Sequence, residues 1–140
     1  MNLLSDLVDH NRNETTCRFR VDEDHVFYRD GQVPICYGVE FLGQCAFYHF
    51  LLNRHEDDQP GKNGLFLGGR KINVSASEFE LDTTYIVYTE DFGTNDRFYA
   101  AAGYIYPQGD ESNRLMEGRL NALLLDREEP LVEGHKEQFT

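Results

Sequence analysis

A run of apolar residues ending at Leu52 constrains the fold of this chain more than any other feature. Two polar residues, Glu40 and Gln44, interrupt the run four positions apart, and Tyr48 follows at the same spacing. On a helix, that spacing puts all three side chains on one face. The remaining positions are apolar on nearly every side, which is typical of a buried helix. The sequence therefore predicts one long core helix, and a buried Glu is rare unless it is paired or functional.

The composition predicts one soluble, acidic domain. The chain has 140 residues and a net charge of −12, which argues against nucleic-acid binding, because phosphate contacts need clustered Lys and Arg. No apolar run reaches membrane-spanning length, so we expect no membrane segment. The N-terminus lacks the features of a signal peptide, and the three cysteines have no metal-like spacing. We therefore expect a cytoplasmic protein with reduced thiols, no metal and no cofactor.

Period-two patterns flank the predicted helix and indicate strands. Residues 83–89, 97–106 and 113–125 are rich in β-branched, aromatic or alternating apolar residues, and residues 91–96 and 107–112 are turn-rich. A further strand is predicted at 65–75, where Gly68 and Gly69 indicate a bulge or a close backbone approach. Two weaker candidates lie upstream, at 3–8 and 16–21.

The order of these elements predicts an α+β fold. The chain is predicted to have two short strands, one buried helix and then four strands. A six-stranded antiparallel sheet wrapped around the central helix accommodates this order, and that arrangement is the hotdog fold. We expect one domain over residues 1–125 and a polar tail at 126–140 that frays. An open sheet edge is a liability, and pairing it across a dimer protects it.

Two segments resemble a known family. "GQVPICYGVEFLGQ" resembles the helix entry of hotdog-fold 3-hydroxyacyl-[acyl-carrier-protein] dehydratases, and "GLFLGGRKINVSASEFELDTT" resembles the strand that follows. "MNLLSDLV" resembles the first strand. The similarity covers roughly residues 1–125 and is strongest to the aryl-polyene-type branch, in which a "DG-x-VP" loop precedes the helix.

The resemblance implies removal of water from a 3-hydroxyacyl thioester. A base takes the C2 proton, an acid protonates the departing hydroxyl, and backbone amides hold the thioester oxygen. Glu40 matches the family's helix carboxylate, and an apolar surrounding favours the neutral form that such an acid needs. Val26 stands where the family has its histidine, so the adjacent His25 is the candidate base.

The same resemblance implies a set of substrate-binding groups. Gln44 orients the site, and the N–H of Gly68 faces the thioester oxygen. The helix N-terminus at Gly38 supplies a second amide. Arg70 and Lys71, with Lys62 and Arg54, are predicted to form a basic patch at the tunnel mouth for an acidic acyl carrier protein; acyl-CoA is the alternative thioester.

Other interpretations remain open from the sequence. Glu40 is also consistent with a structural carboxylate, His25 with an ordinary surface residue, and the Arg70–Lys71 pair with a solvated strand end. Cys36 is interpreted as an apolar filler rather than a nucleophile. A hotdog thioesterase and a non-catalytic subunit of a heteromeric dehydratase are the alternative functions, and the dimer is either homomeric or formed with a related hotdog subunit.

Overall fold

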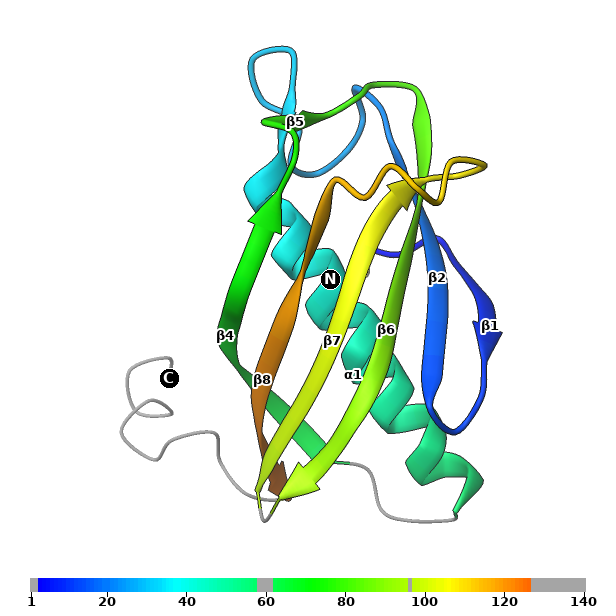
Figure 1. Ribbon diagram of the computed structural model, residues 1–140, viewed down its shortest axis with the longest axis vertical. Helices are drawn as coiled ribbons and strands as arrows, with labels where there is room; N and C mark the ends of the chain where they lie inside the picture. Colours follow the sequence, from blue (N-terminus) through cyan, green and yellow to red (C-terminus); the bar gives the residue numbers. More distant parts are fainter. Residues whose placement is uncertain (1–2, 58–61, 96, 127–140) are drawn as a thin grey trace.

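An antiparallel sheet lies against one long helix in the computed structural model, which describes residues 3–57, 62–95 and 97–126, with the backbone alone at 62–67 and 126 (Figure 1). The six strands of the main sheet are ordered β1-β2-β6-β7-β8-β4, and β3 and β5 form a second, two-stranded sheet. The elements are β1 (Asp6–His10), β2 (Glu14–Val21), β3 (Val33–Pro34), the 3-10 turn η1 (Ile35–Tyr37), α1 (Gly38–Glu56), β4 (Lys62–Val74), β5 (Glu78–Phe79), β6 (Thr83–Asn95), β7 (Phe98–Pro107) and β8 (Met116–Asp126). The predicted hotdog fold is confirmed. Of the predicted tail, 126–140, all but Asp126 lies outside the described residues.

The strands form where alternate residues are apolar. In β7, Tyr99, Ala101 and Ile105 are buried while their neighbours along the strand are half-buried or, at Phe98, exposed, so one face of the strand meets the core. β6 runs on to Asn95, so the turn predicted at 91–96 is wrong over most of its length. A register shift between Asp91 and Gly93 lets the pairing with β7 continue through those turn-type residues.

β4 contains two irregularities. The predicted bulge is confirmed, because the pairing with β8 shifts register between Phe66 and Gly68. A second shift lies between Arg70 and Asn73, and Lys71 there has a φ of 53°, in the left-handed region.

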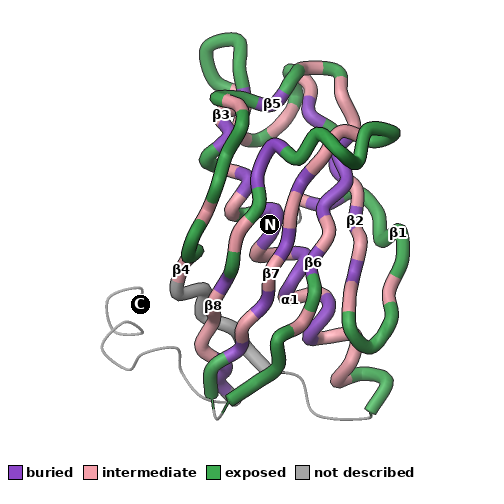
Figure 2. Tube along the Cα trace, viewed as in Figure 1, coloured by how far each residue is buried: buried purple, intermediate pink, exposed green. Residues whose placement is uncertain are grey.

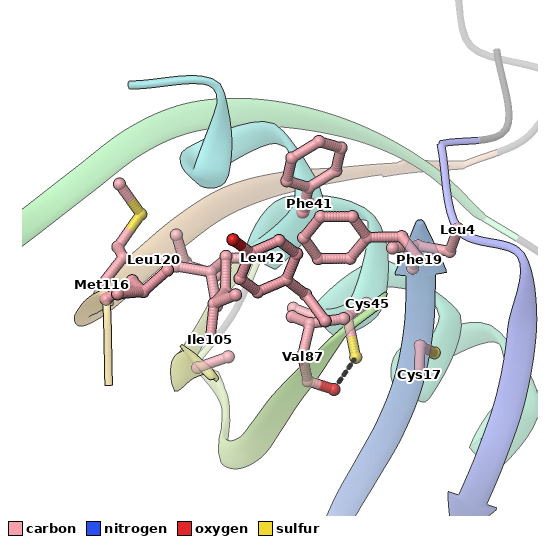
Figure 3. Packing of buried hydrophobic residues seen from close by; sticks show 14 of the residues in the cluster. Leu4, Cys17, Phe19, Phe41, Leu42, Cys45, Val87, Ile105, Met116 and Leu120 are labelled. Atoms are coloured by element: carbon pink, nitrogen blue, oxygen red, sulfur yellow. Dashed lines mark hydrogen bonds between the residues drawn. The ribbon is translucent and has the colours of Figure 1, made fainter. Parts of the chain in front are cut away.

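The core lies between α1 and the inner face of the sheet (Figures 2 and 3). Phe41 of α1 stacks on Phe19 of β2 with 4.0 Å between ring centroids, and both are fully buried. Gly38 lets the start of the helix approach β7 and β8, since a Cβ there would lie 2.7 Å from the Met116 sulfur. Close packing of this kind fixes the helix on the sheet.

The segment Ile35–Glu56 is, by length and composition alone, long and apolar enough to cross a membrane, contrary to our sequence estimate. The test is weak, since core helices of soluble proteins pass it as well. Here the helix packs Phe41, Leu42 and Phe50 into the core, which accounts for its apolar composition.

Candidate functional site

A pocket of about 340 Å³ lies between α1 and the strands β7 and β8. We call it the Glu40 pocket; its lining residues are Glu40, Gly43, Gln44, Ala46, Phe47, Tyr48, Tyr99, Leu120, Asn121 and Ala122. The lining is mostly apolar, with a few polar groups contributed by one face of the helix. Such a combination is typical of a small-molecule site that holds an apolar ligand and orients its polar end.

Glu40, Gln44 and Tyr48 meet in this pocket, as their helical spacing predicts. Gln44 accepts a hydrogen bond through Oε1 from the backbone N–H of Leu3, at 2.8 Å, so the N-terminal segment orients its amide. Burial raises the pKa of Tyr48, which keeps its hydroxyl protonated.

Glu40 itself is exposed in the single chain. The expectation that its own helix environment buries this carboxyl is therefore wrong. The reason is its position in the first turn of α1, on the face that borders the pocket rather than the face that Phe41 and Leu42 present to the sheet. The carboxylate is open to a ligand or to a partner chain.

His25 does not line the Glu40 pocket. Its ring lies 5.6 Å from the Phe41 ring, centroid to centroid, and its Nδ1 accepts a hydrogen bond from the backbone N–H of Phe27 at 3.1 Å. Burial lowers the pKa of His25 and so favours the neutral imidazole, and the Asp22 carboxylate partly offsets this shift. Its protonation state thus suits a base, but within one chain it is not brought to the pocket that holds Glu40.

The two predicted backbone donors are placed differently. The N–H of Gly38 is directed at the carbonyl oxygens of Ile35 and Cys36 in η1, so it is already engaged. Later amides of the first helical turn lack a side-chain cap in the described structure, and they are the better donors at this helix end. Gly68 has a φ of 133° and pairs with Asn121, which places its bulge beside a lining residue of the pocket.

Arg70 and Lys71 line a different hollow together with Arg119, and this hollow shares Leu120 and Asn121 with the Glu40 pocket. Arg54 lies over the Phe50 ring, 5.5 Å from its centroid, near the end of the helix. The side chain of Lys62 lies outside the described residues. The basic patch predicted at the tunnel mouth is therefore not found among the described lining residues of the Glu40 pocket.

Tyr99, Leu120 and Asn121 are pocket residues that the sequence analysis missed. The hydroxyl of Tyr99 donates to the carbonyl oxygen of Ala46 at 3.4 Å, and its burial raises its pKa. The alternation of apolar and polar residues along β7 and β8 predicts that Tyr99 and Leu120 face the core. The same alternation does not show that α1 leaves this part of the sheet uncovered.

A buried polar cluster lies away from the Glu40 pocket, near the C-terminal end of α1. The Thr15 hydroxyl lies 2.7 Å from Nδ1 of His10 and 2.8 Å from Nδ1 of His49, and Nε2 of His49 lies 3.3 Å from the Asp91 carboxylate. Thr15 and His49 are almost fully buried, whereas the Asp91 side chain is 23% exposed. The cluster joins β1, β2, β6 and α1. Among the described residues, no group of three or more His, Cys, Asp or Glu side chains is arranged to hold a metal ion.

The family model for ApeP-like proteins, described as ApeP dehydratase, matches residues 1–132 of the chain. The chain belongs to the ApeP-like dehydratase family. The match agrees with the resemblance in the helix-entry and strand segments and covers all of the described sheet. A search of the curated proteins finds no match.

Solved structures similar to this ApeP-like chain share its hotdog fold. The dehydratase heterocomplex ApeI:P from Xenorhabdus doucetiae superimposes with a TM-score of 0.79 at 22% identity, covering 99% of this chain and 88% of that one. A hypothetical thioesterase from Streptococcus pneumoniae, solved with coenzyme A, has a TM-score of 0.66 at 12% identity, covering 89% and 95%. Zebra fish thioesterase superfamily member 2 has a TM-score of 0.65 at 11% identity, covering 85% and 79%. At these identities the likeness shows the fold alone.

Proposed function

We propose that this ApeP-like chain is a dehydratase subunit that removes water from a 3-hydroxyacyl thioester and yields the trans-2-enoyl thioester in polyene-type biosynthesis. The observation that carries the proposal is the Glu40 pocket, in which a carboxylate, an amide and a phenol on one helix face border an apolar space. The apolar lining suits an acyl chain, and the polar face suits its oxygenated end.

The residues of the pocket supply an acid and orienting groups. A base takes the proton from C2, and Glu40 in its protonated form gives a proton to the hydroxyl on C3. Water leaves and the double bond forms between these two carbons. Charge that develops on the thioester oxygen is stabilised by backbone amides of the first turn of α1, while Gln44, held through Leu3, orients the site.

The base and the cover over Glu40 are proposed to come from a second hotdog subunit. In the described part of this chain no histidine lines the Glu40 pocket, and the carboxylate is exposed. β4 is an edge strand beside β8, so a neighbouring sheet can pair there close to the pocket. The heteromeric assembly of the similar ApeI:P complex supports this arrangement. A homodimer that supplies His25 from the other copy is the alternative that the test distinguishes.

An acyl carrier protein is the proposed donor of the thioester, and the cytoplasm is the proposed location. The carrier is supported by the resemblance of the helix-entry motif to carrier-dependent dehydratases. The location is supported by the three free cysteines, of which Cys17 and Cys45 are buried.

A hotdog thioesterase is the second candidate, because an exposed carboxylate without an imidazole is also suited to activating water against the thioester. One assay separates the candidates: a 3-hydroxyacyl carrier protein is incubated with the chain and analysed by intact mass. Loss of one water supports the dehydratase, release of the free acid supports the thioesterase, and a substrate that stays unchanged both with the chain alone and with the second subunit contradicts both. Running the chain alone, with the proposed second hotdog subunit, and as His25→Ala identifies which chain supplies the base.

A further inference from the structure

A hollow of about 210 Å³ at the strands β4, β6, β7 and β8 is lined by three cationic residues, Arg70, Lys71 and Arg119. We call it the cationic hollow; its other lining residues are Phe92, Ala100, Ala101, Leu120 and Asn121. No carboxylate is among these described lining residues. The chain has a net charge of −12, so three cations around one hollow give a local positive charge on an otherwise acidic protein.

The backbone of β4 is irregular where it contributes two of these cations. Arg70 and Lys71 are consecutive residues and both line the hollow. The pairing with β8 shifts register between Arg70 and Asn73, and Lys71 has a left-handed φ of 53°. A non-glycine residue in this region carries a cost in conformational energy, and such strain is often kept where it positions a functional side chain.

The three cations have no ion pair among the described residues. Other arginines do: Arg18 is paired with Asp6 at 3.0 Å, and Arg114 with Glu117 at 3.4 Å. Arg119 instead lies over the Phe92 ring, 5.4 Å from its centroid. Two acids, Glu90 and Glu117, line another hollow that shares Lys71 and Arg119.

We propose that the cationic hollow binds the phosphate group of a phosphorylated ligand. Guanidinium groups match phosphate oxygens with paired donors, and an ammonium group adds a compact charge, so two arginines and a lysine suit a phosphate better than a neutral ligand. The phosphate belongs either to a free small molecule or to a pantetheine-type arm, and the experiment separates these sources. The arm as a source rests on the proposed function, whereas binding of a free phosphorylated ligand does not.

The test is calorimetric titration of the full chain at low ionic strength with three probes: pyrophosphate, 4′-phosphopantetheine and pantetheine. We expect at least one phosphorylated probe to bind, pantetheine to bind more weakly, and added salt to weaken the binding. Binding of pyrophosphate supports a free phosphorylated ligand, and binding of 4′-phosphopantetheine alone supports the arm. Absence of binding by both phosphorylated probes overturns the proposal.

Substitutions locate the binding. Arg119→Gln and Lys71→Asn are each expected to lower the affinity for the phosphorylated probe by about tenfold, because each removes one charge-assisted contact. Asn is chosen at position 71 because it tolerates the left-handed backbone while it removes the charge. Arg18→Gln, in the same sheet and paired with Asp6, is the matched control and should bind like the wild type. Equal weakening in all three variants, or in none, contradicts the assignment.

Discussion

Replacement of Thr15 by Val should destabilise the protein strongly although it changes almost no volume. The Thr15 hydroxyl is the shared partner of Nδ1 of His10 and Nδ1 of His49, at 2.7 and 2.8 Å. A hydroxyl has one donor and two acceptor positions, so it satisfies both ring nitrogens, and Val leaves the two nitrogens without this partner. Each buried group left unsatisfied costs about 1–3 kcal/mol, so for the two nitrogens we expect a loss of about 2–6 kcal/mol in the free energy of unfolding.

Urea unfolding followed by circular dichroism measures this loss, which is a large share of a typical stability of about 5–15 kcal/mol. Thr16→Val is the matched control, because Thr16 is the next residue of β2 and is only half-buried, on the other face of the strand. A loss below about 1 kcal/mol in Thr15→Val, or an equal loss in the control, would refute the reasoning that the hydroxyl holds the two histidines.

Two further predictions concern pH and packing. Burial lowers the pKa of His49 in the folded state, so the unfolded chain takes up the proton first. Stability should be full above about pH 6.5, the unfolded pKa, and should fall as the pH drops below it; a flat unfolding midpoint between about pH 7.5 and about pH 5.5 would contradict this. Gly38→Ala should lower stability by about 1–3 kcal/mol, because the new Cβ would lie 2.7 Å from the Met116 sulfur; an unchanged melting temperature would show that Met116 moves aside without cost.

Much of the fold was predictable from the sequence because the signals were local. An apolar helix and period-two strands specify a sheet around a helix, and the glycine pair at Gly68 marked a real bulge. The extension of β6 to Asn95 was not predictable, since Gly93 and its polar neighbours read as a turn while the pairing with β7 holds them in a strand. The short β3–β5 pairing was also missed, because strands of two residues carry no periodicity.

The candidate site was predicted in part. Helical spacing placed Glu40, Gln44 and Tyr48 on one face, and the structure brings them to one pocket. The contribution of Tyr99 and the exposure of Glu40 depend on how far α1 covers the sheet, which no local pattern specifies. Arg70 and Lys71 lie at a second register shift, in a stretch without glycine, so no local sequence signal marks it.

The most direct test of the central claim is dehydration of a 3-hydroxyacyl carrier protein by this chain together with the proposed second hotdog subunit, with the wild type and Glu40→Gln compared. Gln keeps the shape of the side chain but provides no acid, so the account predicts loss of one water from the substrate with the wild type and a rate at least about a hundredfold lower with the variant. Equal rates for the two proteins would contradict the claim that Glu40 is the acid of this site.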